Sequence, residues 1–281
     1  MAIYSEKAEK ATGLQLSDAH FHLGFVSNPV DFAVDAQRAG VPVFAASVTP
    51  SEYRDTKRAL CWAAAPLQPV GDSASIKLAV GLHPWWVSAD ERHLAAVLRA
   101  FDGALPETQY VGEVGLDFSK CRIATRDAQL RAFRHIANAC AKDGGKVLSI
   151  HCVKAYDDVL SILDSSGCFA SCTCIFHWFS GSFQQLEQAA DAGCFFSLGA
   201  RMLETKKGSE YAKAAPLRKL LLETDAPAAI DPEQEHPSVL YSYDQMRLQL
   251  VETLKRLARI RGIGESELAA IVQQNACEVF C

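Results

Sequence analysis

The residues most able to do chemistry in this sequence are four histidines and two acids that follow short apolar segments. His20 and His22 stand two positions apart in the run Asp-Ala-His-Phe-His that starts at Asp18. Side chains at alternate positions of a strand point the same way, so both imidazoles can face one metal ion. The other four residues follow later apolar segments: Glu113, His151, His177 and Asp225. All six are ligand types for Zn²⁺, Mn²⁺ or Mg²⁺.

Six ligands of these types suit two divalent metal ions. A carboxylate can bridge two ions whereas a neutral imidazole cannot, and we expect Glu113, on a middle segment, to be the bridge. Two such ions can activate water and polarise a phosphoryl or carbonyl oxygen. A single histidine after a strand is more often a hydrogen-bonded structural residue. The prediction therefore depends on all six residues meeting, and no Gly-x-Ser-x-Gly nucleophile motif competes with it.

Bringing these residues together requires a scaffold whose strands end at one face, and the rest of the sequence predicts one. Short apolar segments rich in β-forming residues alternate with helical patterns along the chain. The expected strands are 14–21, 43–48, 76–82, 110–114, 146–151, 171–177, 194–198 and 220–223. The expected helices are 29–39, 51–65, 89–101, 126–142, 156–164, 183–192 and 209–215, with two closing helices near 241–260 and 265–279.

This alternation is typical of parallel strands joined by crossover helices. Eight strands with no flexible linker between them predict an α/β fold, a single (β/α)8 barrel of the TIM type, with the metal site at the C-terminal ends of the strands. A doubly wound open sheet is the alternative, but no glycine-rich dinucleotide motif follows the first strand. We expect residues 14–281 to form the domain and residues 1–13 to be a flexible segment.

Composition narrows the function classes. The 281 residues include 28 Lys and Arg against 33 Asp and Glu, a net charge of −5, which argues against a protein that coats long nucleic acids. No apolar run approaches the roughly 18 residues of a membrane span, and no signal-peptide core opens the chain, so we expect a cytoplasmic protein without membrane contacts. The cysteine cluster Cys168, Cys172 and Cys174 is better explained by small core residues than by a zinc site.

Seven segments, in order along nearly the whole chain, resemble the TatD family of metal-dependent hydrolases in the amidohydrolase superfamily. They are D-A-H-F-H (18–22), G-L-H-P (81–84), G-E-V-G-L-D (112–117), S-I-H (149–151), F-H-W-F-S-G-S (176–182), E-T-D-A-P (223–227) and N-A-C-E-V-F (275–280). Members of that family are mostly nucleases that commonly trim DNA or RNA from the 3′ end. Some relatives do other hydrolytic work, including deacylation of misacylated tRNA.

The resemblance implies which of the six residues bind each metal ion. One metal ion would be held by His20, His22 and Asp225, and the other by His151 and His177, with Glu113 between them. Asp225 would also orient or deprotonate the attacking water. The implied substrate is the end of a DNA or RNA strand, which makes the leading hypothesis a two-metal deoxyribonuclease or exonuclease.

Three further residues are candidates for substrate contacts, each with a structural alternative. His83 can contact a phosphate, or it can be a turn residue fixed by the proline that follows. Ser180 precedes a predicted helix, where hydroxyls and amides either cradle a phosphate or cap the helix. Lys154 offers a cation to a phosphate, although solvated lysines are the commoner case.

Two tryptophans and two acids near these motifs also have alternative interpretations. Trp85 and Trp86 can stack a nucleobase or simply pack a loop. Glu223 and Asp117 can orient metal ligands through hydrogen bonds, or they can be ordinary surface and turn acids.

The sequence departs from the common family pattern after the last strand. Many family nucleases carry an arginine-rich stretch there, whereas residues 228–240 are acidic and contain no Arg or Lys. Lys154 also stands where an arginine is frequent. These changes favour, as an alternative to the nuclease, a metal-dependent amide or ester hydrolase such as a deacylase.

A looser similarity points to a biological setting. The segments H-W-F-S-G-S, A-G-C-F-F-S-L-G-A-R-M and E-T-K-K-G-S-E resemble the TatD-like subunit of Qat anti-phage defence systems. This resemblance implies other Qat proteins as partners. It also raises a third hypothesis, a defence-complex subunit with mainly a binding role, against which the six intact ligands weigh.

Overall fold

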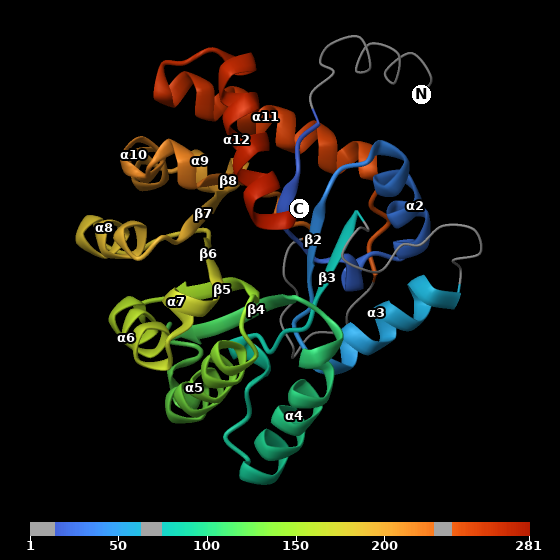
Figure 1. Ribbon diagram of the computed structural model, residues 1–281, viewed down its shortest axis with the longest axis vertical. Helices are drawn as coiled ribbons and strands as arrows, with labels where there is room; N and C mark the ends of the chain where they lie inside the picture. Colours follow the sequence, from blue (N-terminus) through green and yellow to red (C-terminus); the bar gives the residue numbers. More distant parts are fainter. Residues whose placement is uncertain (1–14, 63–74, 228–237) are drawn as a thin grey trace.

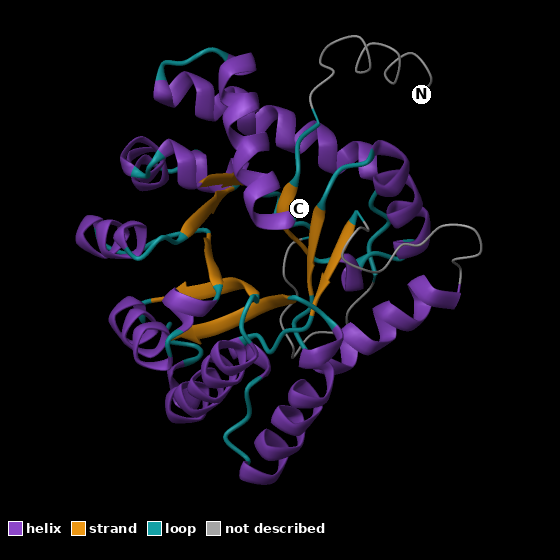
Figure 2. Ribbon diagram, viewed as in Figure 1, coloured by secondary structure: helices purple, strands orange, loops and turns teal. Residues whose placement is uncertain are grey.

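The computed structural model describes residues 15–62, 75–227 and 238–281. Its eight strands form a ring in Figure 1, with helices on the outside that Figure 2 sets apart by colour. All eight lie where the sequence predicts them: β1 (Asp18–Phe21), β2 (Val43–Ala46), β3 (Ile76–Ala79), β4 (Tyr110–Asp117), β5 (Val147–Val153), β6 (Thr173–His177), β7 (Phe195–Leu198) and β8 (Leu220–Leu222). Neighbouring strands pair in parallel.

The ring consists of a three-stranded sheet, β1-β2-β3, and a five-stranded sheet, β4 to β8, joined at two seams. At the first seam, the Val80 amide donates to the Tyr110 carbonyl (3.1 Å) and the Gly112 amide to the Val80 carbonyl (3.1 Å). At the second seam, the Asp225 amide donates to the His20 carbonyl (3.0 Å). These bonds close the strands into the predicted (β/α)8 barrel.

The long helices lie where the sequence predicts them, and the structure has two further short helices. The long ones are α2 (Pro29–Ala39), α3 (Pro50–Trp62), α4 (Glu91–Ala104), α5 (Arg126–Asp143), α6 (Tyr156–Ser166), α8 (Phe183–Asp191), α10 (Lys206–Ala214), α11 (Tyr243–Arg261) and α12 (Glu265–Phe280). The sequence did not predict α7 (Cys168–Ser171) or α9 (Ala200–Leu203). One turn of helix is too short to show a 3.6-residue period, so such elements escape pattern analysis.

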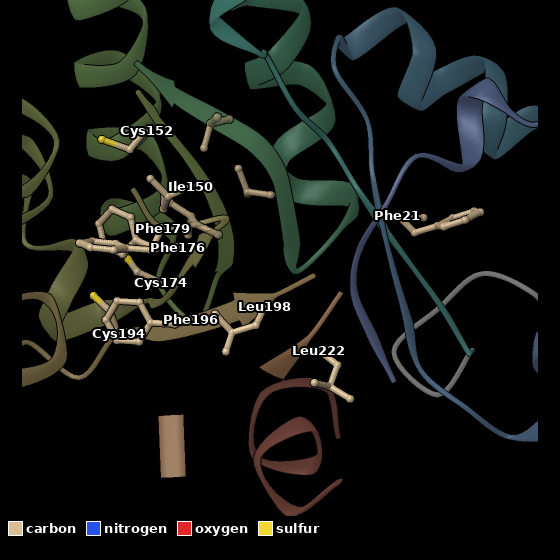
Figure 3. Packing of buried hydrophobic residues seen from close by; sticks show 14 of the residues in the cluster. Phe21, Ile150, Cys152, Cys174, Phe176, Phe179, Cys194, Phe196, Leu198 and Leu222 are labelled. Atoms are coloured by element: carbon tan, nitrogen blue, oxygen red, sulfur yellow. The ribbon is translucent and has the colours of Figure 1, made fainter. Parts of the chain in front are cut away.

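Side chains along a strand alternate between the barrel interior and the helices, and β5 shows the rule clearly. Leu148, Ile150 and Cys152 belong to the apolar layer between strands and helices, whereas Val147 belongs to the layer inside the barrel. Figure 3 shows Ile150 and Cys152 together with residues of the same outer layer from the next strands, including Cys174, Phe176, Phe196 and Leu198. The in-between positions, Ser149 and His151, therefore face inward.

One end of the barrel interior is filled by apolar side chains. Phe280, near the end of α12, is buried among this inner layer, and its ring centroid lies 6.0 Å from that of Phe44 and 6.4 Å from that of Tyr110. Apart from Phe195, the remaining members of the layer are small or aliphatic residues of the strands and α12. The closing helix α12 thus covers the N-terminal end of the strands, and the chemistry is left to the opposite end.

A β-bulge in β4 turns Glu113 into the barrel. Val111 pairs with Leu148 and Val114 with Ile150, so Gly112 and Glu113 together stand opposite the single residue Ser149. Such bulges re-aim side chains beside active sites. The expected strand 110–114 was too short, because β4 continues to Asp117; β5, expected to end at His151, likewise continues to Val153.

Some predictions fall outside the described residues: the flexible segment 1–13, the end of the helix expected at 51–65, and most of the acidic stretch 228–240. The three clustered cysteines are free thiols within or against the core, as predicted. Among the described helices, none has the length and apolar character needed to cross a membrane.

Candidate metal centre

The six predicted ligands converge around the carboxylate of Glu113, and its two oxygens face different partners. Oε2 lies 3.5 Å from Nε2 of both His20 and His22. Asp225 completes this side, with its Oδ1 3.3 Å from His22 Nε2 and 4.0 Å from His20 Nε2. His20 lies on β1, His22 directly follows β1, and Asp225 lies in the turn after β8; the second seam of the barrel holds these segments together.

The other oxygen of Glu113 faces the remaining two histidines. Oε1 lies 2.9 Å from His151 Nδ1 and 3.0 Å from His177 Nε2. These two nitrogens lie 3.5 Å from one another. Glu113 thus stands between two clusters of ligand atoms, one on each oxygen.

The far nitrogens of three imidazoles have hydrogen-bond partners that orient the rings. His22 Nδ1 lies 3.2 Å from the Ala46 carbonyl, and His151 Nε2 lies 3.3 Å from Asp117 Oδ2. Both partners only accept, so these nitrogens donate, and in the neutral ring the opposite nitrogen keeps its lone pair. His20 Nδ1 is similarly 2.7 Å from Ser149 Oγ. Each of these rings therefore presents a nitrogen to Glu113.

The atoms facing the centre fit a cation. His20 Nε2, His22 Nε2 and Glu113 Oε2 are buried and have no hydrogen-bond partner among the described residues. Buried polar atoms without partners need an explanation. Two ligands about 2.1 Å from a tetrahedral Zn²⁺ lie about 3.4 Å apart, close to the separations found here. The buried groups of histidine and acid ligands could accordingly hold a divalent metal ion.

Electrostatics point the same way. Burial by itself would raise the pKa of Glu113, but the surrounding histidines hold that pKa well below its usual range. Burial would likewise lower the pKa of His22, yet the carboxylates of Asp225 and Glu113 raise it to about 9. The buried carboxylates therefore favour positive charge at this place, and a divalent cation can supply it.

His83 reaches the same carboxylate but differs from the six ligands. Its Nε2 lies 3.0 Å from Glu113 Oε1. Its Nδ1 accepts a hydrogen bond from the Trp85 amide (3.0 Å), which places the ring proton on Nε2. Burial lowers the pKa of His83 to about 4, so the ring is neutral near pH 7. A nitrogen that holds a proton is a donor, which suits a substrate oxygen better than a metal ion.

Two further acids support the histidines. Asp117 accepts a hydrogen bond from Trp85 Nε1 (2.7 Å) in addition to that from His151. Glu223 accepts from the Ser197 hydroxyl and lies 3.9 Å from His177 Nδ1. Both acids are buried. The interpretation of both as surface acids was wrong, although Asp117 also serves its turn, because its Oδ1 accepts from the Ser119 amide (2.8 Å).

Backbone strain gathers at the rim of the centre. Among the described residues other than glycine, three have positive φ: Lys154 (55°), Trp178 (43°) and Asp225 (50°). They follow β5, β6 and β8. Such conformations cost about 1–3 kcal/mol each and cluster at functional sites.

A cavity of about 300 Å³ opens onto these residues. Its walls include Trp85, Trp178 and Arg201, and the guanidinium carbon of Arg201 lies 4.9 Å from the centre of the Trp178 ring. Sequence reasoning singled out neither Trp178 nor Arg201 as a contact. Trp178 lay inside a quoted motif directly after His177, and that position was the signal available. Arg201 lies on the short helix α9 and inside the segment A-G-C-F-F-S-L-G-A-R-M (192–202), which was the signal available for it.

The remaining candidates for substrate contacts lie near the metal centre, and their surroundings differ. Ser180 lines the cavity, but its amide donates to the Tyr156 hydroxyl (2.6 Å), and Ser182 forms the capping box of α8 with Gln185. The amides of Ser180 and Ser182 thus have protein partners, as the helix-capping alternative expects. Lys154 is exposed and lines a second, adjoining cavity. Trp86 packs against the core.

Comparison with known proteins shows which family the chain belongs to. The model of the TatD related DNase family matches residues 17–281. The chain belongs to the TatD related DNase family. The family resemblance expected from the sequence is thereby confirmed.

Relatives within this TatD family are enzymes named for nucleic-acid cleavage. The chain is 27% identical over 276 residues to the 3′-5′ ssDNA/RNA exonuclease TatD of Salmonella typhimurium, covering 92% of this chain and 98% of that protein. It is 26% identical over 211 residues to the human deoxyribonuclease TATDN3, covering 72% and 73%.

Solved structures confirm the barrel. A TatD family hydrolase from Entamoeba histolytica matches with a TM-score of 0.75 at 15% identity, covering 96% of this chain and 99% of that one. The TatD homologue YJJV from Escherichia coli matches with a TM-score of 0.72 at 22% identity, covering 95% and 98%. At these identities the likeness concerns the fold.

Proposed function

We propose that this protein is a divalent-metal-dependent exonuclease that hydrolyses phosphodiester bonds at the ends of single-stranded DNA or RNA. The observation that carries the proposal is the position of Glu113, whose two oxygens face different, adjoining sets of ligand atoms. One metal ion would be held by His20, His22 and Asp225, and the second by His151 and His177, with Glu113 shared. Family membership and the names of the relatives support the same reaction.

Two bound ions, Mg²⁺, Mn²⁺ or Zn²⁺, would supply an activated water and stabilise charge on the phosphoryl oxygens. Asp225 has one carboxylate that faces both the first cluster and the cavity. It is therefore placed to orient the attacking water and take its proton. His83 lines the cavity with its proton on Nε2, 3.0 Å from Glu113 Oε1, and can donate to a phosphoryl oxygen that binds beside this carboxylate.

The cavity favours a single strand as substrate. Trp85 and Trp178 line it, and aromatic side chains there can stack unpaired bases. Arg201 brings a guanidinium to the same wall, where it can pair with a phosphate. A base held in a duplex has its faces covered by its neighbours, whereas a strand end offers them to the tryptophans.

The first test compares wild type with Glu113→Gln and Asp225→Asn on end-labelled single-stranded DNA and RNA, with Mg²⁺, Mn²⁺ or Zn²⁺ added in turn. We expect metal-dependent shortening by wild type and a loss of about a thousandfold or more in both variants. The position of the label gives the direction of digestion. Replacement of Lys213, which lies at the far end of α10, is a control that should leave the rate unchanged.

No cleavage by wild type with any metal would overturn the exonuclease proposal. The same centre could then act on amide or ester bonds, because two metal ions polarise a carbonyl as well as a phosphoryl oxygen. Acyl and amide substrates, including aminoacylated tRNA, would be the next panel.

The cellular setting remains a prediction from the sequence. We place the protein in the cytoplasm, and we propose partnership with other Qat defence proteins from the three segments that resemble a Qat subunit. Co-expression with candidate Qat proteins and a phage plaque assay would test this. Protection that survives Glu113→Gln would indicate a binding role, and protection that disappears with it would indicate an enzymatic one.

A further inference from the structure

A second cavity of about 500 Å³ adjoins the metal centre. Val153 and Ser180 line both cavities, so the two lie side by side. The second cavity extends away from Glu113 toward the starts of α6 and α10. A strand whose last phosphodiester lies at the metal centre would therefore find more space in this direction.

Two lysines line this second cavity from separate segments. Lys154 follows β5, and Lys207 lies in the first turn of α10. Lys207 Nζ donates to the Ser180 carbonyl (3.0 Å), which keeps its ammonium near the junction of the two cavities. Within residues 15–62, 75–227 and 238–281, no carboxylate forms an ion pair with either lysine. Both side chains are exposed and can meet an anion.

The acids of this cavity already have partners. Asp157 accepts a hydrogen bond from Gln185 Nε2 (2.7 Å), and Asp158 forms an ion pair with Arg126 (3.4 Å). Arg126 thereby offsets the charge of Asp158, and Asp157 is engaged by a neutral amide, whereas neither lysine has a carboxylate partner among the described residues. The cavity can thus attract an anion although it contains both signs.

The wall at the junction is rigid. The Tyr156 ring is buried, and its hydroxyl accepts the Ser180 amide (2.6 Å) and lies 3.3 Å from Ser180 Oγ. Ser180 is held in this way between the two cavities, with its hydroxyl at their border. The position of Ser180 between the two cavities is therefore set by Tyr156.

We propose that the second cavity is a binding subsite for the backbone phosphate adjacent to the scissile one, with Lys154 and Lys207 as its cations. The inference rests on the proposed nuclease function and extends it to a substrate of at least two phosphodiesters. It also gives a source of positive charge in a protein whose segment after β8 lacks Arg and Lys: the cations come from the segments after β5 and β7.

The test uses thymidine oligonucleotides without terminal phosphates. A dinucleotide has one phosphodiester and fills only the metal centre, whereas a trinucleotide also fills the second cavity. We expect the double variant Lys154→Ala/Lys207→Ala to raise KM for the trinucleotide about tenfold and to leave kcat, and both constants for the dinucleotide, unchanged. Because the subsite holds one phosphate, its loss should also reduce the salt slope of log affinity by about 0.7.

Lys213→Ala, at the other end of α10, is the matched control and should behave as wild type; circular dichroism checks that each variant folds. Equal KM values for wild type and double variant on the trinucleotide would overturn the subsite and leave the nuclease function standing. If wild type cleaves neither substrate, the proposed function fails. Binding of labelled trinucleotide without metal then decides the subsite: weaker binding by the double variant supports it, and equal binding overturns it.

Discussion

The two ends of the barrel interior are built from different chemistry. At the N-terminal ends of the strands, apolar side chains pack against Phe280 of α12. At the C-terminal ends, buried histidines and acids surround Glu113, and several of their polar atoms have no partner in the described protein. The first end buries apolar area and so stabilises the fold, whereas the second leaves polar groups that only a ligand can satisfy.

Individual strands contribute side chains to both ends of the barrel interior. Along β5 to β8 and in the residues directly after β8, positions that face inward change from apolar residues to hydroxyls or directly to ionisable groups. The series are Val147, Ser149 and His151; Ile175 and His177; Phe195 and Ser197; and Leu221, Glu223 and Asp225. Because alternate residues of a strand face the same side, the same inward-facing positions supply both the apolar layer and the site. Each half can be changed without touching the other.

The largest expected effect concerns the metal end. Saturating Zn²⁺ or Mn²⁺ should raise the free energy of unfolding of metal-free wild type by about 2.7 kcal/mol per site at 100 times Kd, or about 5 kcal/mol for two sites. Glu113→Gln should lose most of this gain, because the shared ligand of both ions is weakened. Urea unfolding with and without metal measures it, and an equal gain in the variant would contradict a shared carboxylate.

The opposite end should respond only in stability. Phe280→Ala removes a buried ring from the apolar layer, and we expect it to lower the free energy of unfolding by about 3–5 kcal/mol. The gain in stability on adding metal should match that of wild type, because the layer is separate from the ligands. Denaturant titration with intact far-UV circular dichroism checks both. A lost metal response in the folded variant would show that the ends are coupled.

Asp18 lies at the second seam, where β1 meets the segment that follows β8. Its Oδ2 accepts from the Thr224 hydroxyl (2.5 Å), and its Oδ1 accepts from the amides of Thr224 (3.1 Å) and His20 (3.0 Å). Asp18→Ala leaves these donors without a partner, which should lower the free energy of unfolding by about 2–3 kcal/mol. Unlike Phe280→Ala, it should also weaken metal affinity, because it releases His20 and Asp225. Metal titration by calorimetry measures this affinity. An affinity equal to that of wild type would show that Asp18 does not position the metal ligands.

Much of the barrel was predictable from the sequence because its signals are local. Each strand is a short apolar segment, and each long helix has a repeating apolar face with clear ends, such as the capping box at Ser242 and the positive φ of Gly262 around α11. The six ligands were recognisable because residue type and position after a strand are both visible in sequence.

What could not be predicted depends on three dimensions. The bulge at Gly112 and Glu113 exists only as a pairing offset between β4 and β5. The proton position on His83 depends on a backbone amide in the following turn. The role of Arg201 depends on its approach to Trp178, which lies more than 20 residues earlier in the chain. Periodicity carries no information about such contacts.

The smallest expected effect separates the cavity wall from the metal end itself. Trp178→Ala removes a surface for base stacking and should weaken single-strand affinity by about 1–3 kcal/mol, with little change in metal affinity. Trp62 is 90% exposed on α3 and lines neither cavity, so Trp62→Ala is a matched control that should bind like wild type. Fluorescence anisotropy with a labelled oligonucleotide measures both. Equal affinities for the two variants would mean that Trp178 packs the rim without stacking a base, and substrate selection would then depend on the charged groups alone.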